Sequence, residues 1–238
     1  MIEIRDYTVM DLEMTGLHPK NDKIIEIGAV KVRDGKVIET LELMVDPECP
    51  IPERIQELTG ITDEMVQGGQ KEDEAVEELL RFIGEDVLVG QNVIFDYSFV
   101  KQWAINHKRP LEMKAWDTLR LAQSLLPKEQ PKKLEALCEY FHIERTRAHR
   151  ALDDALETKL VFEKLVELTG ENAEELLKPK VLQYKAKRQT PATTHQLERL
   201  KEFVELHEMK DEILYEKLTR SEASRLMDKY LAIYGRKP

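Results

Sequence analysis

The sequence has little of several residue types, and each scarcity excludes a class of protein. Two cysteines among 238 residues cannot build a disulfide framework or a cysteine-rich zinc site. No apolar run approaches the roughly 20 residues that cross a bilayer, and the opening MIEIRDYTVMD lacks the apolar core of a signal peptide. The phosphate-binding patterns GxGxxG and GxxxxGK[ST] are also absent. We therefore expect a reduced, cytoplasmic protein with no membrane partner and no nucleotide cofactor.

The composition that is present suits a folded enzyme. The 42% share of apolar residues can fill a core, and 238 residues fit one large domain, or one domain with a small appendage. The net charge of -10 at first argues against a nucleic-acid partner. The charge is uneven, however: residues 171–238 hold 14 Lys and Arg against 12 Asp and Glu, which leaves net -12 in residues 1–170.

A basic stretch marks the expected domain boundary. PKVLQYKAKRQ, residues 179–189, carries four basic residues, including Lys187 and Arg188, and no acid, and the linker-like TPATT follows it. A solvated hinge is one interpretation, and a strand that neutralises phosphates is the other. We predict a catalytic domain over 1–178, a basic linker over 179–193 and a small helical module over 194–238.

The apolar periodicity predicts an α/β fold. Strands are expected at 7–13, 24–32, 37–45, 87–89 and 113–116, and helices at 72–83, 97–106, 117–126, 132–141 and 150–168. Asp34-Gly35 is a typical hairpin turn between the second and third strands. A three-strand meander followed by alternating strands and helices indicates a mixed sheet with helices packed on it.

Three acids stand at expected strand ends or helix starts. Asp11 and Glu13 are two residues apart, so the period of a strand points both carboxylates to one face. Such pairs are common on surfaces, but Met10 and Leu12 indicate that the opposite face is apolar. Adjacent carboxylates repel, and a bound cation relieves the repulsion. Asp96 opens an expected helix, where capping and the helix dipole alone can explain an acid.

A histidine and two further acids lie in HRALDD, residues 149–154. Helical spacing pairs His149 with Asp153, four residues on. One interpretation is an acid-rich helix start with a structural histidine. The other is a base with a pKa near neutral pH, beside a metal-binding acid.

Together these groups form a donor set for hard divalent cations. Magnesium and manganese prefer carboxylate oxygens and water. Four carboxylates with one imidazole suit two Mg²⁺ or Mn²⁺ ions better than zinc. Two ions about 3.5–4 Å apart can activate water and stabilise a leaving oxygen, as phosphodiester hydrolysis requires.

Three motifs resemble those of the DEDDh exonucleases, which are DnaQ-like 3′-to-5′ exonucleases. VMDLEMTG resembles the first motif, NVIFD the second and HRALDD the third, and their order and separation match over most of residues 6–168. LTGIT at 58–62 and WDT at 116–118 are similar to further family segments. The resemblance implies a ribonuclease H-like fold, with a mixed sheet of about five strands flanked by helices.

The resemblance also implies residue roles. It makes Asp11, Glu13, Asp96 and Asp154 the ligands of two Mg²⁺ or Mn²⁺ ions, and His149 the base that deprotonates the attacking water. It thus selects Asp154 rather than Asp153, the acid that helical spacing pairs with His149.

Further residues match the family's contacts to the terminal nucleotide, with Leu17 as an apolar wedge and Phe95 either near the nucleotide or in the core. The full set is Thr15, Gly16, Leu17, Thr59, Gly60, Asn92 and Phe95. One departure is Gln91, because many members have histidine there. It puts a substrate contact in doubt rather than catalysis.

The implied activity is metal-dependent 3′-to-5′ hydrolysis of single-stranded DNA, which releases nucleoside 5′-monophosphates in replication proofreading or repair. An RNA 3′-to-5′ exonuclease and a docking subunit of a replication complex are the alternatives. The expected partners are 3′ ends of single-stranded DNA or RNA and a DNA polymerase or other replication protein.

The tail from residue 194 has two amphipathic helical patterns, and Thr219 to Glu222 has the spacing of a capping box. About 45 residues are too few for a strong independent core. The tail is either an appendage packed on the exonuclease or on a partner, or a module that holds nucleic acid.

Overall fold

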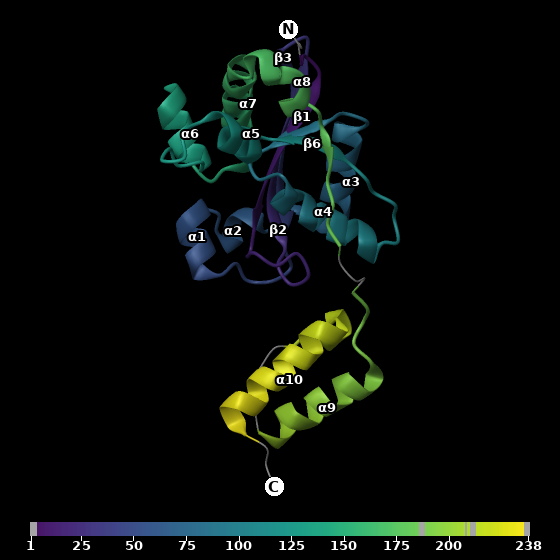
Figure 1. Cartoon of the computed structure of the whole chain (residues 1–238). Helices are drawn as coiled ribbons and strands as arrows, with labels where there is room; N and C mark the ends of the chain where they lie inside the picture. Colours follow the sequence, from purple (N-terminus) through teal and green to yellow (C-terminus); the bar gives the residue numbers. More distant parts are fainter. Residues whose placement is uncertain (1–3, 186–188, 208, 210–212, 236–238) are drawn as a thin grey trace. The chain divides into compact units, whose positions relative to one another are not determined.

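The computed structural model describes residues 4–185, 189–207, 209 and 213–235 (Figure 1). These residues form two compact units. The first contains residues 4–103 and 110–185, and the second contains residues 104–109 and the described residues from 189 onward. Every residue expected at the active site lies in the first unit.

The first three strands form an antiparallel meander of β1 (Tyr7–Met14), β2 (Ile24–Arg33) and β3 (Lys36–Asp46). Asp34 and Gly35 join β2 to β3 with φ angles of 49° and 72°. A tight two-residue hairpin needs positive φ at both positions, and Asp and Gly are among the residues that tolerate it. The hairpin predicted from the sequence is therefore confirmed.

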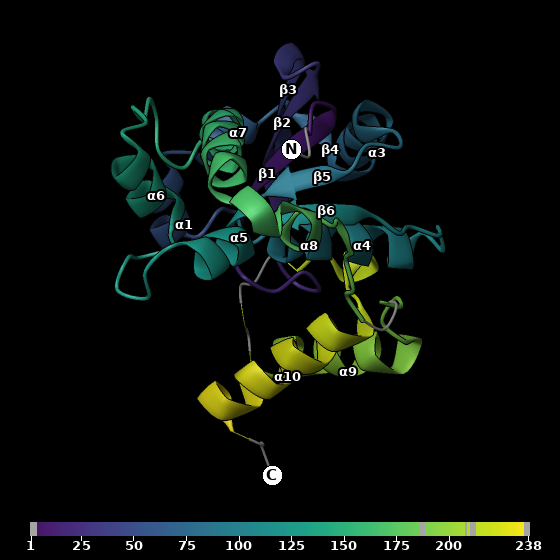
Figure 2. The ribbon, with the colours of Figure 1, turned by 45° about the horizontal axis from the view of Figure 1, so that its top comes forward.

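The rest of the sheet makes it mixed. β5 (Leu88–Gly90) pairs in parallel with β1, and β6 (Lys114–Asp117) pairs in parallel with β5. The two-residue strands β4 (Gln70–Lys71) and β7 (Lys180–Val181) give the order β4-β3-β2-β1-β5-β6-β7. The predicted mixed sheet is confirmed, with its five longer strands in the expected places. Because β1, β5 and β6 are parallel, their carboxyl ends meet at one edge (Figure 2).

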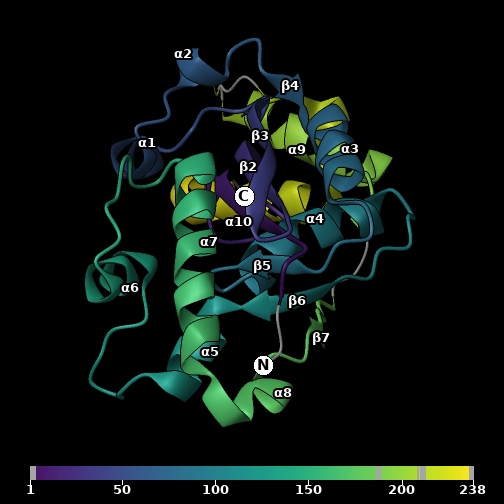
Figure 3. The ribbon, with the colours of Figure 1, turned by 90° about the horizontal axis from the view of Figure 1, so that it is seen from above.

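Helices cover both faces of this sheet. They are α1 (Glu53–Thr59), α2 (Asp63–Val66), α3 (Glu72–Ile83), α4 (Ile94–Asn106), α5 (Thr118–Leu125), α6 (Leu134–Phe141), α7 (Ala151–Leu168), the 3₁₀ turn η1 (Gly170–Asn172) and α8 (Ala173–Leu176). Figure 3 shows α5, α6 and α7 on one side of the sheet and α3 and α4 on the other. None of the helices in the described chain is long and apolar enough to cross a membrane.

The largest helix packs on the sheet through aromatic residues. Phe162 of α7 is buried, and its ring centroid lies 5.3 Å from that of Tyr7 on β1 and 5.7 Å from that of Trp116 on β6. The indole nitrogen of Trp116 donates a hydrogen bond to the carbonyl oxygen of Leu177, which satisfies its polar atom in the core. These contacts pack α7 against the central strands, and they help to set where its first turn meets the sheet.

The expected linker begins as part of the sheet, because Lys180 and Val181 form β7 against β6. Lys187 and Arg188 lie outside the described residues. The boundaries predicted at 178 and 193 stay predictions.

The second unit contains two capped helices. They are α9 (Thr194–Leu206) and α10 (Arg220–Tyr234), with a 3₁₀ turn η2 (Tyr215–Lys217) before the second. Thr193 with Gln196, and Thr219 with Glu222, form complete capping boxes, and the second of these was predicted from the sequence. Leu200, Met227 and Tyr230 form the buried centre of this unit.

Candidate active site

The edge where the parallel strands end carries three of the expected acids. β1 supplies Asp11 and Glu13, and α4, which follows β5, supplies Asp96 in its first turn. The Oδ1 atom of Asp96 accepts a hydrogen bond from the backbone amide of Leu12 at 3.1 Å. That bond ties α4 to β1, so this carboxylate has a role beyond capping its own helix.

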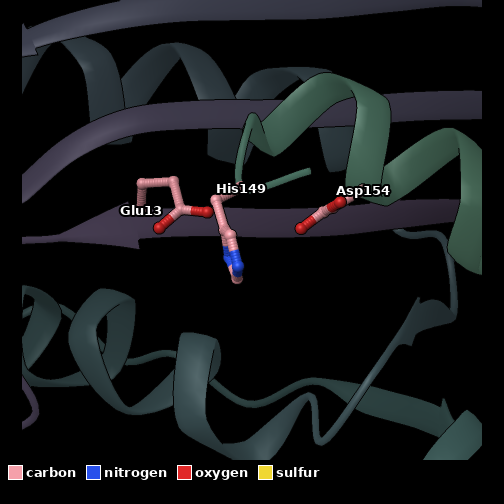
Figure 4. Close-up of side chains that lie close together, drawn as sticks. All are labelled: Glu13, His149 and Asp154. Carbon is pink, nitrogen blue, oxygen red and sulfur yellow. The ribbon is translucent and has the colours of Figure 1, made fainter. Parts of the chain in front are cut away.

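The expected base lies just before α7 and not within it. His149 has a φ of 60°, a left-handed conformation that ends any helical register with the residues after it. Ligand atoms of Glu13, His149 and Asp154 all lie within 4.8 Å of one another. Figure 4 shows the three side chains converging from β1, from the segment before α7 and from α7 itself.

The pairing of His149 with Asp153 that helical spacing predicted is wrong. It assumed a helix through His149, where the backbone is left-handed. Asp153 instead accepts a hydrogen bond from Nε of Arg147 at 2.8 Å. The acid that the resemblance selected, Asp154, is the one beside the imidazole.

Burial raises the pKa of all four carboxyls, and repulsion by neighbouring acids of the same cluster adds to this for Asp11 and Glu13. The pKa of Glu13 rises to about 8, first through burial and then through the charge of Asp154. The pKa of Asp96 rises to about 7, mainly through burial. Burial also raises the pKa of Asp11, with repulsion by its acidic neighbours added, and raises that of Asp154 although Arg145 lies beside it. Acids that resist ionising together are the arrangement that bound cations relieve.

Arginines near the start of α7 compensate part of this charge. Nη2 of Arg145 lies 2.6 Å from Oδ1 of Asp154, and its Nε lies 2.6 Å from Oε2 of Glu157. The backbone amide of Thr146 donates to the other oxygen of Glu157 at 3.3 Å. The segment that carries His149 is thus held to the first two turns of α7 through Asp154 and Glu157.

The residues expected to contact substrate fall into two groups. Thr15 and Thr59 are buried, and both hydroxyls bond to the backbone: Oγ1 of Thr15 accepts from the amide of Lys23, and Oγ1 of Thr59 donates to the carbonyl of Ile55. In contrast, Leu17 is 72% exposed.

The remaining expected contacts shape the backbone or stay partly exposed. Gly16 leaves room for the carboxylate of Asp22, which would lie 2.5 Å from a Cβ atom there, and Gly60 ends α1 with a φ of 69°. Asn92 is exposed, with a φ of 55°. Phe95 is half-buried and meets Phe99 edge to face at 5.7 Å. Leu17 and Asn92 are therefore the expected contacts whose side chains are most open to a ligand.

The departure at Gln91 has a structural explanation. Its Nε2 atom donates to the carbonyl oxygen of Lys132 at 2.7 Å, and its Oε1 atom accepts from the hydroxyl of Thr118. Its amide therefore ties the loop before α6 to the start of α5.

Sequence reasoning missed Glu26, Arg145 and Arg150. Glu26 is completely buried on β2 and pairs with Arg150 at 2.6 Å. The available signal was a single carboxylate within the otherwise apolar IIEIGAV. The arginines gave no comparable signal, because their acidic partners are set by the fold.

Comparison with known proteins identifies the family. A family model described as "Exonuclease" (RNase_T) matches residues 8–162. The DNA polymerase III PolC-type protein of Clostridium perfringens (strain 13 / Type A) is 40% identical over 166 residues, which cover 68% of this chain and 12% of that protein. The PolC-type protein of Bacillus subtilis (strain 168) is 36% identical over 176 residues, covering 72% and 12%. The chain thus spans about an eighth of the length of these curated relatives.

Solved structures share the fold. Exonuclease X in complex with 5′ overhanging duplex DNA is 25% identical, with a TM-score of 0.57, over 71% of this chain and 96% of that chain. The nuclease domain of 3′hExo, a DEDDh family member bound to rAMP, is 19% identical, with a TM-score of 0.59, over 68% and 92%. The chain belongs to the exonuclease family, and the matching residues lie in its first unit except for 104–109.

The residues present fit a divalent-metal centre. The donor set is carboxylate oxygens with one imidazole, and the charges of Asp154 and Asp96 add to the effect of burial in raising the pKa of Glu13. Hard oxygen donors under mutual repulsion suit hard divalent cations.

We predict that Mg²⁺ stabilises the protein more at high pH. Folded carboxyls with raised pKa values hold protons that the unfolded chain has released, so metal-free stability falls as pH rises from about 4 toward about 8. Cations favour the ionised form and offset that loss. Thermal unfolding with Mg²⁺ or with EDTA should therefore show a larger metal-induced rise in Tm at pH 8 than at pH 6.

The double variant Glu13→Gln with Asp96→Asn is the control, because it removes two of the raised carboxyls. Its Tm should depend less on pH and on Mg²⁺. An equal Mg²⁺-induced rise at both pH values in the wild type would contradict the prediction.

Proposed function

We propose that the protein is a metal-dependent 3′-to-5′ exonuclease that removes nucleoside 5′-monophosphates from the 3′ end of single-stranded DNA, in replication proofreading or repair. The observation that carries this proposal is the convergence of His149 with Glu13 and Asp154, next to Asp11 and Asp96, at the edge where the parallel strands end.

Asp11, Glu13, Asp96 and Asp154 would hold the metal ions, which we propose to be two Mg²⁺ or Mn²⁺. When bound, such ions lower the pKa of water and stabilise charge on a leaving oxygen. The carboxylates would first have to lose the protons that their raised pKa values favour, so the four acids bind metal and protons in competition.

His149 would accept the proton of the attacking water on an imidazole nitrogen. The water oxygen then bonds to phosphorus while the bond between phosphorus and the 3′ oxygen of the preceding nucleotide breaks. The leaving 3′ oxygen takes up a proton from solvent water, so the products are a nucleoside 5′-monophosphate and a strand one nucleotide shorter with a free 3′ hydroxyl. The left-handed backbone at His149 supports this role, because it turns the imidazole toward Glu13 rather than along α7.

Leu17 and Asn92 would contact the terminal nucleotide. Leu17 is 72% exposed just after β1, where an apolar side chain gains by packing against a base. Gly16 and Gly60 shape the turns near these proposed contacts.

DNA is the proposed substrate because the curated relatives at 36–40% identity are DNA polymerases of the PolC type. The same relatives support a DNA polymerase or another replication protein as a partner. Residues 194–238 would serve either that contact or the binding of the strand beyond the active site.

We predict that loss of the base or of a metal-binding acid removes activity. His149→Ala should slow turnover by about 10²–10⁴-fold, the usual contribution of a general base, and Asp11→Ala should slow it at least as much. The measurement is stepwise shortening of 3′-labelled and 5′-labelled DNA oligonucleotides with Mg²⁺ or Mn²⁺.

His142→Asn is a matched control for the histidine. His142 is exposed and ends α6 with a φ of 55°, a conformation that asparagine tolerates. This variant should keep wild-type activity. Shortening of the 3′ end at the wild-type rate by Asp11→Ala or His149→Ala would refute the assigned mechanism.

We predict faster hydrolysis of DNA than of RNA. Matched single-stranded oligonucleotides that differ only in the 2′ hydroxyl, compared by kcat/KM, test this directly. A higher kcat/KM on RNA would favour the alternative, an RNA 3′-to-5′ exonuclease.

If the tail holds nucleic acid, we predict that deletion of residues 190–238 weakens binding of single-stranded DNA more than it slows turnover at saturating DNA. The reason is that every proposed catalytic residue lies before residue 155. Equilibrium binding without turnover, in Ca²⁺ or EDTA, gives the affinity. An unchanged affinity would leave the tail with partner docking alone.

A further inference from the structure

A fifth acid lies beside the four proposed metal ligands. Glu26 faces Glu13 across the antiparallel pair of β2 and β1, and its side chain is completely buried. Its charge contributes to the raised pKa of both Asp11 and Glu13. A buried carboxylate at such a position needs a compensating group, because burying an unpaired charge is costly.

Both oxygens of Glu26 are engaged by the start of α7. Oε1 accepts from Nε and Nη2 of Arg150 at 2.9 and 2.6 Å, and Oε2 accepts from the backbone amide of Ala151 at 2.8 Å. That amide is one of the donors at the start of α7 that no residue within the helix can satisfy. Glu26 therefore could not approach an ion without releasing the helix, which distinguishes it from a fifth metal ligand.

The same contact depends on a glycine. Gly28 lies on β2 two residues after Glu26, and a Cβ atom there would lie 2.1 Å from the carbonyl carbon of Ala151 and 2.2 Å from the amide nitrogen of Leu152. The backbone of α7 thus rests directly on β2. The approach is close enough for a glutamate on the strand to reach the first helical amide.

We propose that Glu26 is a positioning residue of the active site, which docks the first turn of α7 on β2 and thereby holds His149 and Asp154 opposite Glu13. His149 immediately precedes the docked pair Arg150 and Ala151, and Asp154 follows within one turn. The inference rests on the proposed function for the roles of those side chains, whereas the docking itself rests on the contacts of Glu26.

The chemistry of the contact requires a carboxylate. In Glu26→Gln, the amide nitrogen must face either the guanidinium of Arg150 or the amide of Ala151, and it opposes a donor in both cases. We expect kcat to fall by about 10–100-fold, as for other partners that orient metal-site residues, with KM for the oligonucleotide within about twofold. In the metal-free protein, amide hydrogen exchange at Ala151, followed by NMR, should become about tenfold faster or more.

Glu42→Gln is the matched control. Glu42 is the other acceptor of Arg150, at 3.4 Å, but its side chain is 40% exposed. This variant removes a negative charge from the same arginine and leaves the bond between Glu26 and Ala151 intact. Its kcat and its Ala151 exchange rate should stay within about twofold of the wild type.

Two further variants test the docking if Glu26→Gln does not fold. Gly28→Ala adds a methyl group against the backbone of Ala151 without changing any charge, and it should lower kcat and speed Ala151 exchange in the same way. Arg150→Lys keeps the charge but cannot donate from two nitrogens to Glu26. It should therefore lower kcat and speed Ala151 exchange by a smaller factor.

Wild-type kcat together with a wild-type exchange rate at Ala151 in Glu26→Gln would overturn the proposal, and so would a rise in KM at unchanged kcat. An inactive wild-type protein would refute the proposed function instead. The Ala151 exchange rates, measured without metal or substrate, would still decide whether Glu26 docks α7.

Discussion

The placement of four carboxylates with little access to water at one edge of the sheet is the constraint around which the rest of the first unit is arranged. Asp11, Glu13, Asp96 and Asp154 crowd one edge of the sheet, and the pKa of each is raised. Such a cluster costs folding free energy at neutral pH unless positive charge offsets it. The chain itself supplies only part of that charge, chiefly through Arg145, which pairs with both an expected ligand and a neighbouring acid. The remaining imbalance fits the donor chemistry of a divalent-metal site.

Two separate structural features bring these acids together. Parallel pairing of β5 with β1 places the start of α4 beside the end of β1, and the bond from the Leu12 amide to Asp96 fixes that junction. The close approach of α7 to β2 at Gly28 supplies the second half of the site. The site is therefore assembled from segments that the sheet joins, and rigid sheet strands hold such groups more accurately than loops do.

The sequence was sufficient for the elements with strong local patterns. The meander, the Asp34-Gly35 turn and α3 follow from alternation, turn chemistry and helical periodicity, and the three motifs contain the acids that the fold brings to one edge of the sheet. The pairing of His149 with an acid could not be derived, because a single left-handed residue cancels helical spacing. Glu26 and Arg150 were missed because residues 124 positions apart meet only through the fold. The short helices α1 and α2 have too few turns for a periodic pattern.

The net charge of -10 is a poor guide to whether the protein binds nucleic acid. Part of the acidic excess in residues 1–170 is the candidate site itself, where carboxylates gather in an arrangement that could hold a metal ion. Once cations are bound, the local field at that edge attracts phosphate, whatever the sign of the total. The arginines near the start of α7 are already paired with acids, so they are not spare phosphate contacts. Under the proposed function, attraction of a nucleic-acid strand to this edge would depend on divalent metal, which would link substrate binding to the carboxylates proposed to serve catalysis.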